Sequence, residues 1–347
     1  SIFVLVVLMV LSLITFPVAA DGESLEAHFI DVGQGDAILL HSSDGTDILI
    51  DGGYPDKGNK ILIYMKRLGI KDLDLVIGSH PHADHIGGLV KVIKNFSVKE
   101  VLDPGVVYST GIFEEYLTTI KEEQIPFRTA LAGDIINFEN SNLKMKVLAP
   151  YKGQLNYGDD INDVSFVIKV VYGEVSFLLT GDAGFDTEDK LVLNKVDIDS
   201  DILKVGHHGS RYSSSNMFLS TVSPEVAVIQ VGANNTYGHP TTEALTRLRR
   251  KGVQEDNIYR NDLHGTVIIT TDGQDYHVKT EKTIVKEDDN RVNLNLAPMG
   301  DIIEVPGINY EMANEIIDYR KDFGYLLNIT ELVNSLDSIA AENADEI

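Results

Sequence analysis

The sequence predicts an α/β fold, an αββα sandwich with two β-sheets between two layers of helices, followed by a small all-α domain with a helix-hairpin-helix. Short apolar runs typical of strands alternate with longer amphipathic runs typical of helices. Three of the strands end in polar loops rich in His, Asp and Gly, as expected where strand ends share one edge of a sandwich. A Pro-Gly turn between two short helical patterns follows near the end of the chain.

The length and composition indicate a globular protein with one large domain and a small appendage. The chain has 347 residues, of which 43% are hydrophobic, and single domains of about 200–250 residues are common. The 29 Lys and Arg against 53 Asp and Glu give a net charge of −24, which argues against tight, non-specific docking on a polyanion. The sequence contains no Cys, which excludes thiol catalysis, cysteine zinc sites, disulfides and lipoprotein anchoring.

The first residues form a nearly unbroken apolar run, residues 2–20. Small residues precede Asp21, as a signal peptidase requires, so we expect residues 1–20 to be a signal peptide cleaved after Ala20. The protein would then be secreted. The alternative is a retained N-terminal membrane anchor on an extracytoplasmic protein, because about 19 apolar residues can just span a bilayer.

Residues 21–281 carry the pattern of the sandwich. It opens with an antiparallel meander of strands at 27–32, 37–40 and 48–53 around a Gly-rich turn. The turn could cradle a phosphate, but no helix starts after Gly35 and no Lys-Ser/Thr follows, which argues against that interpretation. The further helices are predicted at 60–68, 85–95, 113–124, 186–193 and 242–250, and the further strands at 73–77, 99–102, 144–148, 164–171, 175–180, 202–205, 226–231, 257–259, 265–271 and 275–279.

Three histidines and a carboxylate stand together directly after the predicted strand 73–77. His80 and His82 can bind one cation while Asp84 and His85 bind a second, because alternate side chains of a strand end point the same way. Neutral imidazole and carboxylate suit Zn²⁺ and tolerate Mn²⁺ or Fe²⁺. The alternative is a solvated turn that happens to be rich in His. Four potential ligands at this spacing argue against that alternative.

The other strand ends add further candidates. Asp182 is the candidate bridging carboxylate between two cations about 3.5–4 Å apart, which together lower the pKa of a bound water to near neutrality. One of His207 and His208 is a further ligand, and the sequence leaves open which one. Asp84 and Asp182 would hold the nucleophile, and His239 is a candidate general acid or phosphate ligand. The alternative for His239 is an ordinary loop residue.

These motifs resemble the signature of the metallo-β-lactamase superfamily, a fold of metal-dependent hydrolases. Five blocks, residues 29–37, 79–88, 179–182, 204–210 and 238–240, look in this order like the hydrolase domain of the ComEC family of bacterial DNA-uptake proteins. The tail, residues 292–347, is similar to the DNA-binding module of ComEA competence receptors. The resemblance implies a secreted nuclease or phosphodiesterase that acts on extracellular DNA with two divalent metal ions, Zn²⁺ or Mn²⁺, and a DNA-binding tail after a linker at 282–291.

The sequence departs from the superfamily at one ligand. Asn162 and Asp163 replace a further His, so the His80/His82 site would be completed by water, Asn162 or Asp163, or would be weakly occupied. Two alternative functions stay open. The first is a hydrolase of small phosphoesters, cell-wall phosphocholine or acyl substrates, because a fold does not fix a substrate. The second is a non-catalytic DNA-binding competence scaffold. Acidic side chains in the tail weaken attraction to DNA, so a protein-contact or spacer role also stays open.

Overall fold

The computed structural model describes residues 23–139, 141–153, 160–282, 294, 297–303, 305 and 308–323. The chain divides into two compact units, one up to Thr283 and one from Ile284 to Ile347. The predicted signal peptide lies outside the described residues, and so does the predicted linker apart from its first residue. Within the described part of the chain, no helix is long and apolar enough to cross a membrane.

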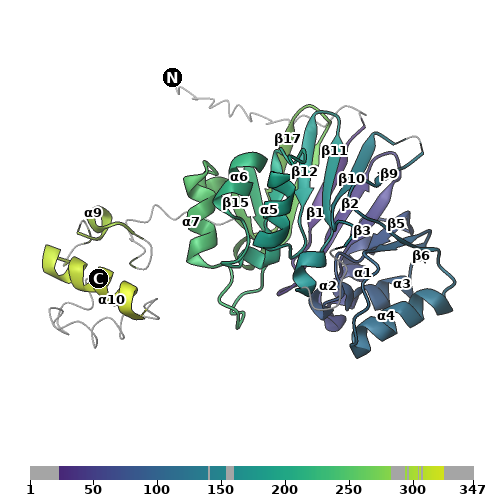
Figure 1. Ribbon diagram of the computed structural model, residues 1–347, viewed down its shortest axis with the longest axis horizontal. Coiled ribbons are helices and arrows are strands. Elements are labelled where there is room, and N and C mark those ends of the chain that lie inside the picture. The colour runs from purple at the N-terminus through teal and green to yellow at the C-terminus, as the bar shows by residue number, and fades with distance from the viewer. Residues whose placement is uncertain are drawn as a thin grey trace, which may run out of the picture. The chain divides into compact units, whose positions relative to one another are not determined.

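Two β-sheets face each other in the first unit (Figure 1). One consists of β1 (Leu25–Phe29), β2 (Ile38–Ser42), β3 (Asp47–Ile50), β5 (Leu75–Ile77), β7 (Val101–Asp103), β8 (Phe127–Thr129), β16 (Val267–Thr271) and β17 (Tyr276–Thr280), in the order β17-β16-β1-β2-β3-β5-β7-β8. The other consists of β9 (Ile135–Asn137), β10 (Leu143–Ala149), β11 (Val167–Tyr172), β12 (Val175–Leu179), β13 (Ile202–Lys204), β14 (Val226–Ile229) and β15 (Ile258–Arg260), in the order β15-β14-β13-β12-β11-β10-β9. Strands β4 (Asp72–Leu73) and β6 (Ser97–Val98) form a separate short pair.

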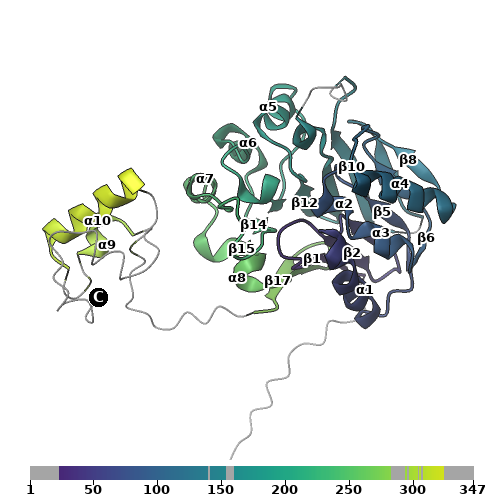
Figure 2. The same ribbon diagram turned by 90° about the horizontal axis from the view of Figure 1, so that it is seen from below.

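Helices cover the outer faces of both sheets, with one group on each side of the sandwich in Figure 2. The first group is α1 (Gly58–Arg67), α2 (Ala83–Ile86), α3 (Leu89–Ile93) and α4 (Gly111–Glu122), and the second is α5 (Phe185–Leu193), α6 (Asn216–Val222) and α7 (Thr242–Arg250). A short α8 (Asn261–His264) and the 3₁₀ turns η1 (Pro55–Lys57), η2 (Ile161–Val164), η3 (Gly206–Gly209) and η4 (Glu255–Asn257) lie in connections. The predicted αββα class is confirmed, as is the predicted helix at 242–250.

The main core lies between the two sheets and follows from the two-residue period of the strands. Leu25, Ala27 and Phe29 of β1 point inward and join Phe177 and Leu179 of β12 in one buried cluster. Each buried Leu or Phe side chain contributes about 1.5–3 kcal/mol by leaving water. The two sheets are therefore fixed face to face, which also fixes their strand ends relative to one another.

The strands that matter for the site are parallel. In the first sheet β3 pairs in parallel with β5, and in the second β12, β13, β14 and β15 pair in parallel in that order. The carboxyl ends of parallel strands lie at one edge of a sheet, where loops commonly carry function. The loops after β5, β12 and β13, which carry the predicted metal ligands, therefore start at the carboxyl ends of parallel strands in both sheets.

Two predicted elements differ in their bounds from the structure at this edge. The predicted helix 85–95 is broken into α2 and α3 at Gly87 and Gly88, because the loop after β3 packs against it. The amide of Gly88 donates to the carbonyl of Gly53 at 2.9 Å, and a side chain on Gly88 would lie 2.0 Å from the carbonyl oxygen of Gly52.

The predicted strand 164–171 starts only at Val167, because the residues before it form η2. Asp160 caps this turn by accepting from the amide of Asn162 at 3.0 Å, and short polar side chains favour such turns over strands. The amide of Phe166 donates to the carbonyl of Ser79 at 2.9 Å, which ties the turn to the loop after β5.

The described part of the second unit is helical, with α9 (Met299–Ile302) and α10 (Tyr310–Phe323) around a turn. Its buried cluster is formed by Ala297, Ile302, Val305, Ile308, Met312, Ala313 and Ile316. Asn309 caps α10 by accepting from the amide of Met312 at 2.9 Å. The predicted small all-α unit is thus helical in the residues that the structure describes, whereas Pro306 and Gly307 of the predicted hairpin lie outside them.

Candidate metal centre

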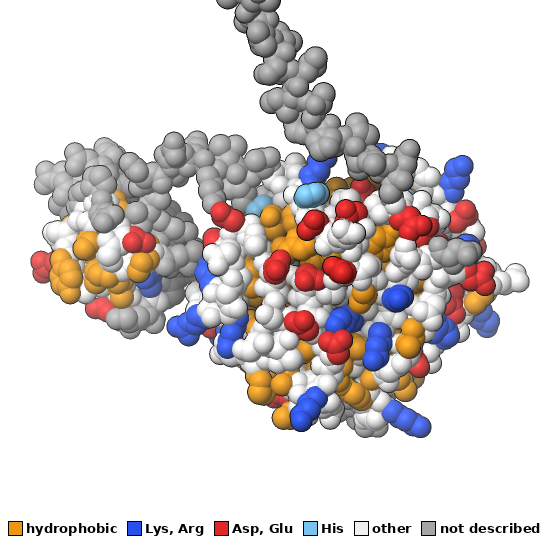
Figure 3. All heavy atoms as spheres, turned by 90° about the horizontal axis from the view of Figure 1, so that it is seen from above, with side chains coloured by type: hydrophobic (Ala, Val, Ile, Leu, Met, Phe, Trp, Pro, Cys, Tyr) orange, Lys and Arg blue, Asp and Glu red, His pale blue; other side chains and the backbone are white. Residues whose placement is uncertain are grey.

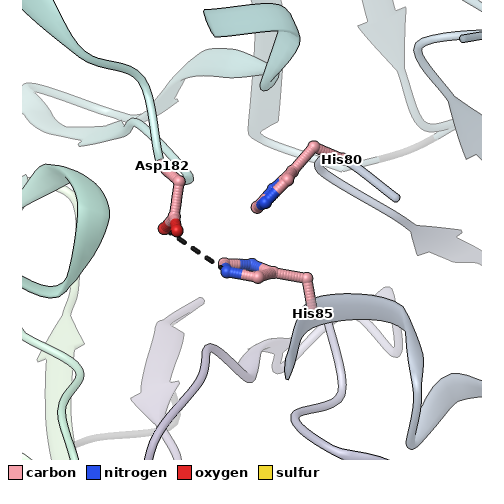
Figure 4. A group of neighbouring side chains, drawn as sticks. All are labelled: His80, His85 and Asp182. Atoms are coloured by element: carbon pink, nitrogen blue, oxygen red, sulfur yellow. Dashed lines mark ion pairs between the residues drawn. The ribbon is translucent and has the colours of Figure 1, made fainter. Parts of the chain in front are cut away.

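His80, His85 and Asp182 meet at the edge where the strands end. Figure 4 shows the three side chains pointing toward one another. One ligand atom of each lies within 4.8 Å of the others, and His85 Nε2 is 3.3 Å from Asp182 Oδ1. All three side chains are buried. Because Asp182 follows β12 in one sheet and the two histidines follow β5 in the other, both halves of the sandwich build this group.

A second group joins Asp84 and His85 to His208 within the same limit. His208 Nε2 lies 3.4 Å from Asp84 Oδ2 and 3.3 Å from Asp182 Oδ2. The two carboxylate oxygens of Asp182 therefore face different histidines, with Oδ1 toward His85 and Oδ2 toward His208. Because Asp182 also belongs to the group of His80 and His85, it lies beside both groups, as a carboxylate shared by two cations would.

The paired histidines after β13 lie differently. Both have left-handed backbone angles, with φ of 48° at His207 and 53° at His208. His208 is buried and belongs to the groups above. His207 Nε2 lies 3.9 Å from Asp182 Oδ2, and its side chain is 28% exposed. His208 is therefore the inner of the two candidates, and His207 lies at the surface of the same cluster.

His82 and His239 complete the set of predicted residues. His82 Nδ1 lies 3.0 Å from His80 Nε2, so His82 extends the first group without being one of its three members. The His239 ring centre is 5.6 Å from that of His207 and 6.5 Å from that of His208. Every predicted site residue therefore lies at one place in the fold.

The two residues that stand in place of a further His have separate surroundings. Asn162 lines the same pocket as the histidines, and its buried Oδ1 accepts no hydrogen bond. Asp163 Oδ1 accepts from the amide of Gly184 at 3.1 Å and from the hydroxyl of Thr187 at 3.2 Å. Asn162 is thus the better placed of the two to add a ligand to the His80 side of the cluster.

Two carboxylates that sequence reasoning missed hold the histidine rings in place. Asp51 Oδ2 lies 2.8 Å from His85 Nδ1, and Asp36 Oδ1 lies 3.3 Å from His208 Nδ1. The carbonyl of Gln230 is also 2.9 Å from His208 Nδ1. Because Nδ1 of each ring contacts one of these partners, each ring presents its Nε2 to the cluster. Hydrogen-bond partners of metal-ligating histidines orient the imidazole in the same way. The Asp-Gly-Gly that ends the predicted strand 48–53 was the available signal for Asp51.

Charge and burial set the protonation of the cluster. Burial raises the pKa of Asp182, but His208 and His85 outweigh it and hold the pKa well below the usual range. Burial lowers the pKa of His85, whereas Asp182 and Asp51 raise it well above the usual range. Burial and the neighbouring His85 lower the pKa of His80 well below the usual range. The carboxylate of Asp182 is therefore charged and the ring of His80 neutral, which are the forms that bind metals.

The residues present fit a divalent cation. His85 Nε2, Asp182 Oδ1 and His208 Nε2 are buried and make no hydrogen bond. Native proteins leave few such atoms without a partner, and a cation among them would supply one. Imidazole nitrogen with carboxylate oxygen is the donor set of zinc and related transition metals.

A pocket of about 450 Å³ opens onto the cluster. Its lining consists of Gln34, Tyr54, His82, Ala83, Asp84, Tyr108, Thr110, Ile112, Asn162, Asp182, His207, His208, Tyr237 and His239. This size lies within the range of small-molecule sites, about 300–1,000 Å³. The candidate ligands are therefore reachable from solvent through a recess with aromatic walls.

Comparison with known proteins gives a consistent set of relatives. Residues 30–232, more than half of the chain, match the model of the metallo-beta-lactamase superfamily, and residues 287–338 match that of the helix-hairpin-helix motif. The chain is 31% identical over 259 residues to ComE operon protein 3 of Bacillus subtilis, which covers 70% of this chain and 32% of that protein. It is 30% identical over 238 residues to competence protein ComA of Neisseria gonorrhoeae, and this match covers 68% of this chain and 31% of that protein.

The chain thus spans about a third of the length of these two relatives. Among solved structures, it is similar to the metallo-beta-lactamase fold protein YhfI from Bacillus subtilis, with 11% identity and a TM-score of 0.46. That match covers 68% of this chain and 95% of YhfI.

Proposed function

Because the chain belongs to the metallo-β-lactamase superfamily, we propose that it is a metal-dependent hydrolase of phosphodiester bonds and that its substrate is extracellular DNA. The observation that carries the proposal is that two groups of candidate ligands, His80, His85 and Asp182 and then Asp84, His85 and His208, share His85 at one edge of the sandwich. One relative is named competence protein ComA and another ComE operon protein 3, which supports a nucleic-acid substrate. The apolar run at residues 2–20 supports secretion.

Two divalent ions, Zn²⁺ or Mn²⁺, would be held by the cluster. His80 and His82 would face one ion, Asp84, His85 and His208 the other, and Asp182 both. Such a pair supplies a water of near-neutral pKa and stabilises negative charge on a phosphoryl group. The side chains of the protein supply the rest. Asp51 orients the imidazole of His85, Asp36 orients that of His208, and the pocket positions the substrate.

His239 is placed to contact the substrate. Its ring lines the pocket, and its buried Nδ1 makes no hydrogen bond. Burial, together with His208 and His207, lowers the pKa of His239 to about 4. The neutral ring can donate one hydrogen bond to a phosphoryl oxygen, which favours the phosphate-ligand role over that of a general acid.

The decisive test uses the mature chain, residues 21–347, with plasmid DNA, a chromogenic phosphodiester and a lactone as substrates. We expect DNA cleavage that stops with EDTA and returns with Zn²⁺ or Mn²⁺. Asp84→Ala should lose at least ~100-fold in rate, as for the removal of one group that stabilises charge in a site. His277→Ala, which changes an exposed histidine outside the pocket, is the matched control. DNA cleavage that persists in EDTA or in Asp84→Ala would contradict the proposal.

Two rival functions have distinct outcomes in the same test. A hydrolase of small phosphoesters, phosphocholine or acyl substrates, which the pocket volume favours, would turn over the chromogenic compounds much faster than DNA. A DNA-binding competence scaffold would shift labelled DNA in the presence of EDTA. That shift would be lost on deletion of residues 292–347, the region that overlaps the matched helix-hairpin-helix motif.

A further inference from the structure

Tyrosine side chains line the pocket at two separate points of its wall. Tyr108 packs edge-on against His82, with ring centres 5.6 Å apart. Tyr237 stacks on His239, with ring centres 5.8 Å apart and ring planes 26° from parallel. His82 and His239 both line the pocket, next to the cluster. An aromatic ring therefore stands beside each of two histidines that a substrate would meet.

The loop of residues 232–240 is built to present Tyr237 and His239 together. Asn235 Oδ1 accepts from the amides of Tyr237 at 3.2 Å and His239 at 3.1 Å. Asn235 Nδ2 donates to the carbonyls of Gly232 at 2.9 Å and His239 at 2.6 Å. The side chain of Asn235 thus fixes the backbone on which both rings stand.

Tyr54, which follows β3, lines the same pocket as Tyr237. Burial, together with the neighbouring Tyr237, raises the pKa of Tyr54. Tyr237 is nevertheless 59% exposed, so one ring face packs on His239 and the other is open to solvent. A ring that is fixed in orientation and open on one face is pre-organised to stack on a flat ligand.

The charge of the protein does little to attract a nucleic acid to this site. The net charge is −24, and among the described residues that line the pocket there is no Lys or Arg. On the face of the molecule drawn in Figure 3, acidic, basic and hydrophobic side chains are interspersed. Affinity for a polyanion normally comes from Lys and Arg on its phosphates. A nucleic-acid substrate must here be held through its bases as well as through metal ions.

We propose that Tyr237 and Tyr108 stack on unpaired bases that flank the scissile phosphate, so that the site prefers single-stranded nucleic acid over duplex. This inference rests on the proposed phosphodiesterase function. Every base has a flat face, so aromatic platforms bind single strands with little regard to sequence. In a duplex these faces are covered by neighbouring base pairs. The reacting phosphate must also reach a cluster in which His85, His208 and Asp182 are buried, which a flexible strand does more readily than a stiff helix.

The test compares three substrates of one length with the metal-loaded full chain: a single-stranded oligonucleotide, the same sequence as duplex, and an abasic strand with the same phosphodiester backbone. Each is cleaved by wild type, Tyr237→Ala, Tyr237→Phe and Tyr108→Ala. Tyr212→Ala removes an exposed tyrosine outside the pocket lining and is the matched control. The readout is the ratio of kcat/KM on the base-bearing strand to that on the abasic strand.

Wild type should prefer the single strand to the duplex and the base-bearing strand to the abasic one. Removal of either ring should lower that second ratio about 5- to 150-fold, as for the loss of one stacked base. The loss should appear in KM, and Tyr237→Phe should keep most of the ratio because it keeps the ring. An unchanged ratio in both alanine variants, or a wild-type preference for duplex, would overturn the inference while leaving the proposed function intact. Absence of cleavage of every nucleic acid would overturn both.

Discussion

Lys204 donates from Nζ to Asp36 Oδ2 at 2.7 Å, and neither side chain reaches solvent. Lys204 ends β13 in one sheet, whereas Asp36 lies in the Gly-rich turn between β1 and β2 of the other. Nζ also donates to the carbonyls of Gly181 at 3.3 Å and Val205 at 2.9 Å. Because Asp36 in turn faces His208, this ion pair connects the two sheets directly behind the candidate metal centre.

Loss of one partner of this pair should destabilise the fold strongly. Lys204→Met leaves the Asp36 carboxylate buried without its cation, and we expect the free energy of unfolding to fall by about 3–5 kcal/mol. Denaturation in urea followed by circular dichroism measures it. Lys99→Met, which breaks an exposed pair with Asp74, should cost under ~1 kcal/mol. Equal losses in the two variants would show that burial of the Lys204 pair does not matter.

Gly35 is required where the first turn meets the metal loop. A side chain there would lie 2.3 Å from the carbonyl oxygen of Asp84, and φ is +118°. Gly45 has φ of +91° with nothing within 4 Å, so it shares the backbone strain without the clash. Gly35→Ala should therefore lower the melting temperature more than Gly45→Ala, which carries only the strain of about 1–3 kcal/mol. Gly35→Ala should also weaken metal binding, because Asp84 must move; equal melting temperatures would contradict this account.

Glu188 should give the stability a specific pH dependence. Its carboxylate accepts from the amides of Ser214 and Ser215, but burial outweighs these bonds and raises its pKa to about 7 from 4.5. Because the folded-state pKa is the higher, this group stabilises the fold fully below pH 4.5, and the contribution is lost as pH rises through 7. The free energy of unfolding of wild type relative to Glu188→Gln should fall by about 2–3 kcal/mol from pH 5 to pH 8. A difference that is flat or rises with pH would contradict the prediction.

Metal content should depend on the inner histidines and not on a surface histidine. His85 contacts Asp51 on one side and Asp182 on the other, so His85→Ala should lower the metal bound per chain and weaken its affinity at least ~10-fold. His277→Ala should bind as wild type does. Elemental analysis after dialysis against a weak chelator measures both, and it requires no substrate. Undiminished metal in His85→Ala would place the ion elsewhere in the chain.

The sequence was sufficient for the fold class and for most of the cluster, because both depend on local pattern. Period-two apolar runs predict the strands, and the run from His80 to His85 sits at a strand end where side chains gather. The resemblance to the metallo-β-lactamase superfamily and to competence proteins is confirmed by the comparisons. The signal peptide, the domain boundaries and the role of each site residue stay predictions.

The sequence was insufficient where distant segments decide the structure. Lys204 stands in an apolar strand and gives no local sign that it meets Asp36 in the other sheet. The predicted helix at 85–95 ignores the loop after β3, whose backbone approaches Gly88. The predicted strand at 164–171 likewise ignores the tie between Phe166 and Ser79. In each case a contact between segments far apart in the chain overrides a local preference.

The central claim is that Asp182 lies between two inner imidazoles and shares cations with them. Anomalous diffraction at the zinc edge from crystals of the metal-loaded full chain tests it most directly. The account predicts anomalous peaks within about 2.0–2.2 Å of Asp182 carboxylate oxygens and of Nε2 of His85 and His208. A fully loaded protein whose anomalous peaks all lie away from these three side chains would contradict it.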